Sequence, residues 1–259
     1  MGVEVSENLE IWDGGYDWPL AGDEWSEAWG GPSHQWWQTL FPRLQGYVPA
    51  ARILEIAPGY GRWTHFLKDL CDEMVIVDLS QECIDRCRER FADDDHIASY
   101  VNDGKSLAMV EDGSIDLAFS FDSLVHVEHE VIEAYLSQLA SKLTPNGIGF
   151  IHHSNMGSYG PVEWDTRNEH WRGLTVSAPS FAATAHSHGL RCVSQEMLTW
   201  GADTLLNDCI SIFTPAGSAW ERPNVVAENS TFSSIEMATS KALSQLYPPS
   251  RRDVRFTTR

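Results

Sequence analysis

The stretch RILEIAPGYGR, residues 52–62, decides the fold that this sequence adopts. Residues 52–57 are largely apolar and predict a buried strand, and Gly59 and Gly61 allow the tight turn that follows it. From residue 62 to residue 71 the apolar side chains recur at helical spacing. A strand, a glycine turn and a helix in this order bring the free amides of a helix N-terminus to the end of the strand, where α/β proteins bind ligands.

The alternation of strand and helix continues along the chain and predicts an α/β fold. A mostly parallel sheet with helices on both faces is expected from this order. Two closely spaced strands near the end predict an antiparallel hairpin, which an ordinary nicotinamide-binding domain lacks. The further strands are expected at residues 74–79, 97–101, 115–121, 148–153, 191–199 and 208–213, and the further helices from Ser80 onward and at 130–143 and 178–188.

Composition divides the chain into three regions. Residues 1–50 hold six of the eleven tryptophans and are interpreted as an N-terminal aromatic-rich cap. Residues 51–215 are expected to form the α/β domain, and residues 216–259 a polar tail with one amphipathic segment at 235–246. Two interpretations of the cap stay open: it folds over a ligand, or it seals one end of the core.

The charge of the chain limits its partners. Asp and Glu number 37 against 18 Lys and Arg, which gives a formal net charge of −19. So acidic a surface repels phosphate backbones and anionic lipids, and neither a nucleic-acid nor a membrane partner is expected. No apolar run reaches the roughly 18 residues that span a bilayer. Five scattered cysteines are typical of reduced thiols, so we expect a cytoplasmic protein. The oligomeric state stays open, with a homo-oligomer among the alternatives.

Polar residues follow the ends of the first three strands. Glu55 lies in the last turn of the first strand, Asp78 at the tip of the second, and Asn102-Asp103-Gly104 after the third. A carboxylate at the second tip can accept both hydroxyl protons of a ribose, and one after the third strand can accept from an adenine amino group. The pyrophosphate-binding spacing G-x-G-x-x-G fails, because Ala57 and Arg62 stand where glycine would be expected. Because Glu55 is acidic, this strand end instead suits a ligand that carries a cationic ammonium and a sulfonium rather than a diphosphate.

These motifs together resemble the nucleoside signature of the class I S-adenosylmethionine-dependent methyltransferases, over about residues 50–215. The resemblance implies a Rossmann-like, seven-stranded sheet that binds S-adenosylmethionine. It assigns cofactor binding to Glu55, Ala57, Gly59, Gly61, Asp78, Asn102, Asp103 and Gly104. Ala57 departs from the glycine that is usual there, and alanine is tolerable at this position if the residue keeps a negative φ.

Histidines and carboxylates gather after the fourth and fifth strands, at the sheet edge expected to hold the methyl acceptor. Histidine is suited to deprotonate an alcohol at neutral pH. We predict His153 as that base, with Asp122 orienting it, and His126 as a further catalytic candidate. Asp122 and His153 are also candidates to share a Mg²⁺ ion. Because side chains alternate along a strand, one of His152 and His153 is expected to be merely packed.

Two segments carry a narrower resemblance. DSLVHVE at residues 122–128 and GFIHHSN at 149–155 resemble bacterial O-methyltransferases that modify sugars, including those acting on methylated polysaccharides of actinobacteria. This resemblance implies methyl transfer to a hydroxyl of a sugar or glycoside, with magnesium as a further cofactor. The loop at 163–173 is a candidate to extend the acceptor pocket with Glu169, His170, Trp171 and Arg172.

Three alternatives stay open beside O-methylation. N-methylation of a small amine needs no base, and the histidines would then be incidental. A non-catalytic cofactor-binding protein would have no need of Asp122, His126 and His153 together. A nicotinamide oxidoreductase is disfavoured by the loop spacing and the closing hairpin.

Overall fold

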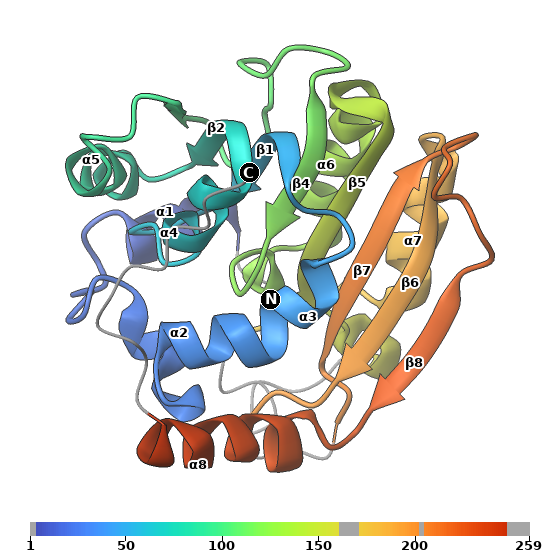
Figure 1. Ribbon diagram of the computed structural model, residues 1–259. Helices are drawn as coiled ribbons and strands as arrows, with labels where there is room; N and C mark the ends of the chain where they lie inside the picture. Colours follow the sequence, from blue (N-terminus) through green and yellow to red (C-terminus); the bar gives the residue numbers. More distant parts are fainter. Residues whose placement is uncertain (1–3, 161–170, 202–204, 248–259) are drawn as a thin grey trace.

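One sheet of eight strands organises the protein (Figure 1). The computed structural model describes residues 4–160, 171–201 and 205–247. The strands lie in the order β3-β2-β1-β4-β5-β7-β6-β8. Their bounds are β1 Ala50–Ile56, β2 Cys71–Asp78, β3 Ile97–Val101, β4 Ile115–Ser120, β5 Leu143–Ser154, β6 Leu190–Leu198, β7 Asp208–Pro215 and β8 Val225–Asn229.

The first five strands are parallel, and the closing part of the sheet reverses direction. β1 pairs in parallel with β2 and β4, β2 with β3, and β4 with β5. β7 runs antiparallel to both β5 and β6. The predicted α/β, Rossmann-like fold with a C-terminal antiparallel hairpin is therefore confirmed.

The sheet has one strand more than the seven that we expected. β8 pairs in parallel with β6, with Ser194 opposite Val225, and lies in the region interpreted as a tail. Four of its five residues are exposed, so it shows neither a buried run nor an alternating pattern. This strand is defined by its backbone pairing with β6, which cannot be recognised from the amino-acid composition of the segment.

Helices cover both faces of the sheet, as the sequence predicts. α6 and α7 pack on one face, against Leu54 and Val75, while Ile53 and Ile76 on the other face pack with the N-terminal helices, α4 and α5. The helical elements are α1 Val5–Trp12, η1 Asp23–Trp29, α2 Pro32–Gln35, η2 Trp36–Leu40, α3 Phe41–Leu44, α4 Thr64–Leu67, η3 Lys68–Leu70, α5 Gln81–Arg90, η4 Leu124–His126, α6 His129–Lys142, η5 Met156–Tyr159, α7 Ala178–Ser187, η7 Phe232–Met237 and α8 Ala238–Leu246.

The N-terminal aromatic residues divide between the core and the edge of the sheet. Trp29 and Trp36 are buried among the side chains of the second face, with Trp36 stacked on Phe66 at a centroid distance of 5.0 Å. α8 runs beside these N-terminal helices, and Ser240 donates a hydrogen bond to the carbonyl of Trp29 at 2.9 Å (Figure 1). α8 and the segment around Trp29 thus lie on the same side of the molecule.

Local signals place the helix that follows the second strand. Ser80 is the N-cap of α5, because its Oγ accepts a hydrogen bond from the Cys83 amide at 3.1 Å. The single helix expected at 62–71 is instead two short elements, α4 and η3, since β2 already begins at Cys71. Within the described residues, no helix is both long enough and apolar enough to cross a membrane.

Candidate active site

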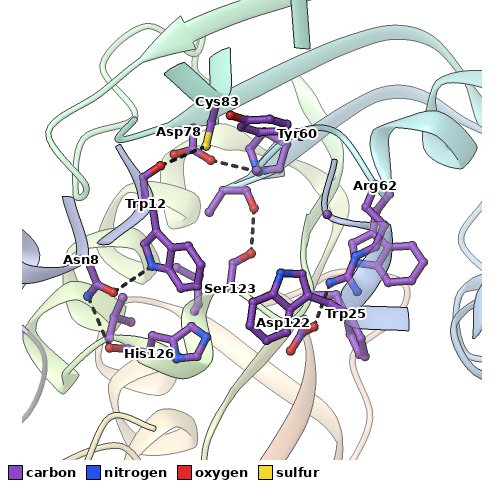
Figure 2. Close-up of a pocket in the computed structure, with 18 of the residues that line it drawn as sticks. Asn8, Trp12, Trp25, Tyr60, Arg62, Asp78, Cys83, Asp122, Ser123 and His126 are labelled. Carbon is purple, nitrogen blue, oxygen red and sulfur yellow. Dashed lines mark hydrogen bonds and ion pairs between the residues drawn. The ribbon is translucent and has the colours of Figure 1, made fainter. Parts of the chain in front are cut away.

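A cavity of about 570 Å³ opens at the carboxyl ends of β1, β2 and β4. Figure 2 shows Asp78 and Tyr60 on one side of it and Asp122 and His126 on the opposite side. Its volume is in the range of small-molecule sites, about 300–1,000 Å³. Among the predicted site residues, those that line the cavity are Ala57, Gly59, Asp78, Gly104, Asp122 and His126. We call the side with Asp78 the cofactor side and the side with Asp122 the acceptor side.

The turn after β1 has a left-handed backbone at three positions. Gly59 has a φ of 57° and Gly61 a φ of 82°, and a Cβ on Gly61 would lie 2.5 Å from the Phe91 ring. Ala57 has a φ of 57°, so the negative φ under which alanine would be tolerated at this position is not met. The turn needs this conformation because the Ala57 amide bonds to the Val77 carbonyl while its own carbonyl accepts from Ser123.

Asp78 presents a buried carboxylate to the cofactor side. Its Oδ2 accepts from the Gly59 amide at 3.1 Å and its Oδ1 from the Ser80 amide at 2.9 Å. Burial raises the pKa of Asp78 to about 6, although these amides oppose the shift. A carboxylate held at the tip of β2 is suited to accept hydrogen bonds from ribose hydroxyls.

Glu55 does not line the cavity. It is fully buried beneath the turn, where its Oε2 accepts from the Thr64 hydroxyl at 2.6 Å. Burial raises the pKa of Glu55 to about 8. In this structure Glu55 and Gly61 therefore shape the loop rather than contact the cavity.

The triplet after β3 contributes less than expected. Gly104 lines the cavity, whereas Asn102 and Asp103 do not. Oδ1 of Asn102 accepts a hydrogen bond from the Gly104 amide at 2.9 Å, and its Nδ2 donates to the Tyr135 hydroxyl at 3.1 Å. Asp103 is exposed and accepts from the amides of the two residues beyond Gly104, at 3.0 and 2.7 Å. These side chains satisfy their own turn, which is the alternative to adenine recognition for such a sequence.

His126 stands on the acceptor side as a neutral base. Its Nδ1 lies 3.1 Å from the Trp171 carbonyl, which can only accept, so Nδ1 carries the proton and Nε2 is an acceptor. Burial lowers the pKa of His126 to about 4, and the charge of Arg172 adds to this effect. His126 is therefore unprotonated at neutral pH.

His153 points to the opposite face of β5, so the structure does not support it as the base. Its ring stacks on Phe181 of α7 at 4.3 Å, and its Nε2 lies 2.8 Å from the Ser211 hydroxyl. It is fully buried, and burial lowers its pKa to about 3. His152 points to the cavity side of the sheet, where it stacks on Phe121.

The magnesium site that we predicted is not assembled from Asp122 and His153. Asp122 instead pairs with Arg62 at 2.8 Å, and both side chains are about nine-tenths buried. In the described ranges, no group of three or more His, Cys, Asp or Glu side chains is arranged to hold a metal ion. The residues that the structure describes thus do not fit this ion.

Several residues that line the cavity have no role predicted from the sequence. Arg62 appeared only as a non-glycine in the loop, although a cation directly after the turn was a usable signal. Trp171 and Arg172 do line the cavity, while Glu169 and His170 lie outside the described residues. The acceptor side is mainly aromatic, with walls from Trp25, Trp29, Trp63, Phe121, Trp171 and Trp200.

Backbone strain concentrates at this cavity. Five described residues other than glycine have a positive φ, and four of them line it: Trp18, Ala57, Asp122 and Trp171. Such conformations cost about 1–3 kcal/mol each and persist where the surrounding structure enforces them, which is common at functional sites. This distribution favours the cavity as the candidate functional site, and it does so independently of the motifs.

Comparison with known proteins agrees with this placement. Residues 53–147 match a family model described as a methyltransferase domain. The N-methyltransferase NodS from Bradyrhizobium japonicum WM9, in complex with S-adenosyl-L-homocysteine, has a TM-score of 0.56 at 16% identity, over 82% of this chain and 98% of that chain. A search of curated proteins found no sequence match.

Two further solved structures share the fold. Geranyl diphosphate C-methyltransferase from Streptomyces coelicolor A3(2), in complex with Mg²⁺, geranyl diphosphate and S-adenosyl-L-homocysteine, has a TM-score of 0.54 at 14% identity, covering 68% of this chain and 76% of that chain. The PH0226 protein from Pyrococcus horikoshii OT3 has a TM-score of 0.52 at 19% identity, covering 68% and 88%. Residues 53–147 thus match a methyltransferase domain, and the solved structures share the fold of this chain.

Proposed function

We propose that the protein transfers a methyl group from S-adenosylmethionine to a hydroxyl of a small molecule, with a sugar or glycoside as the acceptor class. The observation that carries the proposal is the neutral His126, whose Nε2 is an acceptor in the wall of the cavity that also holds the Ala57–Gly59 turn. A hydroxyl must lose its proton when it is methylated, and a positioned neutral imidazole can take it.

The cofactor side fits S-adenosylmethionine by its shape and its donors and acceptors. Asp78 offers a buried carboxylate for ribose hydroxyls, and the backbone comes close at Gly59 and Gly104, where a Cβ would meet Trp18 or Val5 at 2.9 Å. S-adenosylmethionine supplies an electrophilic methyl group when it is bound. Trp18, stacked on Tyr60 at 4.4 Å, and α1 cover this side and keep water from it.

The acceptor side combines aromatic walls with a few polar groups. Aromatic faces pack well on the apolar faces of a sugar ring, and Asp122, Arg172 and His126 offer hydrogen bonds to its hydroxyls. In the reaction, the acceptor oxygen forms the new bond to carbon, the sulfur keeps the electron pair of the bond that breaks, and Nε2 of His126 receives the proton.

N-methylation of an amine is the second candidate. The tryptophans of the acceptor side favour it, because aromatic faces attract cations. An amine would not need His126, since it can lose its proton to water before it reacts.

Replacement of the base tests the proposal. His126→Gln should lower kcat for a hydroxyl acceptor about 10²–10⁴-fold while leaving the affinity for S-adenosylhomocysteine unchanged. Rates would be measured with sugars, phenols and amines as acceptors, and His186→Gln, on the exposed side of α7, is the matched control. Methylation of amines alone, at a rate that His126→Gln does not change, would establish the N-methylation alternative.

A further inference from the structure

Two hydrogen-bond acceptors on the acceptor side lack a donor within the described part of the chain. His126 engages only its Nδ1, which leaves Nε2 without a hydrogen bond. Asp122 accepts from Arg62 through Oδ2, and its Oδ1 has no donor. Both residues line the same side of the cavity (Figure 2). A ligand that satisfies both atoms needs two donor groups.

The orientation of Asp122 is held against its backbone preference. Its φ of 64° lies in the left-handed region, which costs a residue with a Cβ roughly 1–2 kcal/mol. Two contacts enforce this conformation. The Asp122 amide donates to Nδ1 of His152 at 3.2 Å, and its carboxylate pairs with Arg62 at 2.8 Å.

His152 is itself fixed in one orientation and one tautomer. Because Nδ1 accepts from Asp122, the ring proton is on Nε2, which donates to Oδ2 of Asp208 at 3.1 Å. Asp208 is fully buried, and Arg172 donates to both of its carboxylate oxygens at 2.8 Å. Burial alone would raise the pKa of Asp208, but Arg172 and His152 outweigh it and hold the pKa well below its usual value. His152 therefore joins a fixed ion pair to the backbone of Asp122.

We propose that Asp122 binds a second hydroxyl of the acceptor, near the hydroxyl that is methylated, and that His152 is the residue that positions Asp122. The proposal rests on the O-methylation proposed above and narrows its acceptor class to polyols such as pyranosides. An acceptor without the second hydroxyl leaves a carboxylate oxygen unpaired in a closed site, and sites of this kind discriminate strongly against such analogues. Asp122 is thus a specificity-determining residue.

A set of matched acceptors tests the role of the second hydroxyl. Methyl pyranosides would be compared with their monodeoxy analogues, each lacking one hydroxyl, and kcat and KM measured for methyl transfer to each. One of these analogues lacks the reacting hydroxyl. For the wild-type protein, a second analogue should also have a kcat/KM at least tenfold below that of the full pyranoside. In Asp122→Asn, which tolerates a positive φ, this loss should shrink to about threefold or less.

Variants of the two adjacent histidines test the positioning role. Both rings are fully buried, but only His152 contacts Asp122. His152→Phe should raise KM for the full pyranoside at least tenfold and weaken discrimination between it and the analogue. His152→Asn, which keeps an oxygen near the place of Nδ1, should restore both. His153→Phe is the matched control; it should lower thermal stability and leave discrimination unchanged.

The possible failures are distinguishable. Suppose that the wild-type protein methylates hydroxyls with the same kcat/KM for the pyranosides and for every monodeoxy analogue that keeps the reacting hydroxyl. That result overturns the polyol assignment, and O-methylation stands. If His152→Phe and His153→Phe change discrimination equally, the positioning role is overturned. If only amines are methylated, O-methylation itself fails, and the polyol assignment falls with it.

Discussion

Ala57 carries a cost that glycine would avoid. Its φ of 57° is open to glycine without strain, whereas a residue with a Cβ loses roughly 1–2 kcal/mol there. Ala57→Gly should therefore raise the free energy of unfolding by about 0.5–1 kcal/mol, because the greater chain entropy of unfolded glycine offsets part of the gain. Urea denaturation of the two proteins measures the difference. A loss of stability would show that the methyl group of Ala57 is needed for packing.

The carboxyl group of Asp78 should make cofactor affinity depend on pH. Its pKa of about 6 in the free protein means that it is increasingly protonated below that pH, and a protonated carboxyl is a poorer acceptor for ribose hydroxyls. Below pH 6, the affinity for S-adenosylhomocysteine should decrease as the pH falls, with a slope that approaches about tenfold per pH unit. Above pH 7 the affinity should stay constant. Calorimetric titration measures both.

Asp78→Asn provides the control for this dependence. The amide does not titrate, so the variant should bind at least about tenfold more weakly at pH 7, from a lost charged hydrogen bond of about 1.5–3 kcal/mol, and show no step near pH 6. Equal affinity of the wild-type protein at pH 5 and pH 8 would remove Asp78 from the cofactor site.

At single positions, the sequence predicted which strand ends meet but not which way each side chain turns. Asp78 and Asp122 were expected at the same edge because parallel strands share it, and both line the cavity. His152 and His153 had to face opposite sides, yet alternation alone does not say which side is covered by α7. Nearness to the strand end favoured His153, and the packing of Phe181 overrules it.

At the scale of elements, the N-terminal segment lies over the cofactor side of the cavity. Trp18 stacks on Tyr60, and a Cβ at Gly59 would lie 2.9 Å from its ring. If the segment acts as a lid, Trp18→Ala should lower kcat/KM at least tenfold and change the melting temperature by only a few degrees. Trp220→Ala, with an indole 44% exposed and packed on Tyr47, is the control for loss of a tryptophan. Normal turnover in Trp18→Ala would make the segment a structural appendage.

The elements that the sequence located are those with a burial pattern. β1, β2 and β4 are runs of buried residues, and all three were expected close to where they lie. β8 has mostly exposed residues, so nothing in its composition separates it from a loop. The sequence also did not predict which tryptophans of the first 50 residues lie in the core and which lie over the cavity. A tryptophan in the core and a tryptophan over a ligand have the same sequence signature.

At the scale of the whole molecule, Glu55 is a buried acid in a protein that already carries a net charge of −19. Glu55 is fully buried, and its nearest polar partner is a neutral hydroxyl, that of Thr64. Ionising it in the folded protein is unfavourable, while the unfolded chain ionises it near its ordinary pKa of 4.5. Folding and the protonation of Glu55 are therefore coupled.

The sign of this coupling predicts how stability changes with pH. A carboxyl group with a raised pKa in the folded state holds its proton where the unfolded chain has lost it, so it contributes stability below about pH 4.5 that is lost as pH rises to about 8. Glu55→Gln keeps an oxygen that can accept from Thr64 and does not titrate. The free energy of unfolding of this variant, minus that of the wild-type protein, should thus increase steadily from pH 5 to pH 8 in urea denaturation. Glu111→Gln, at an exposed position, should show no such increase. If the wild-type and Glu55→Gln curves stay parallel across this range, Glu55 ionises freely in the folded protein, and the turn above it is open to water.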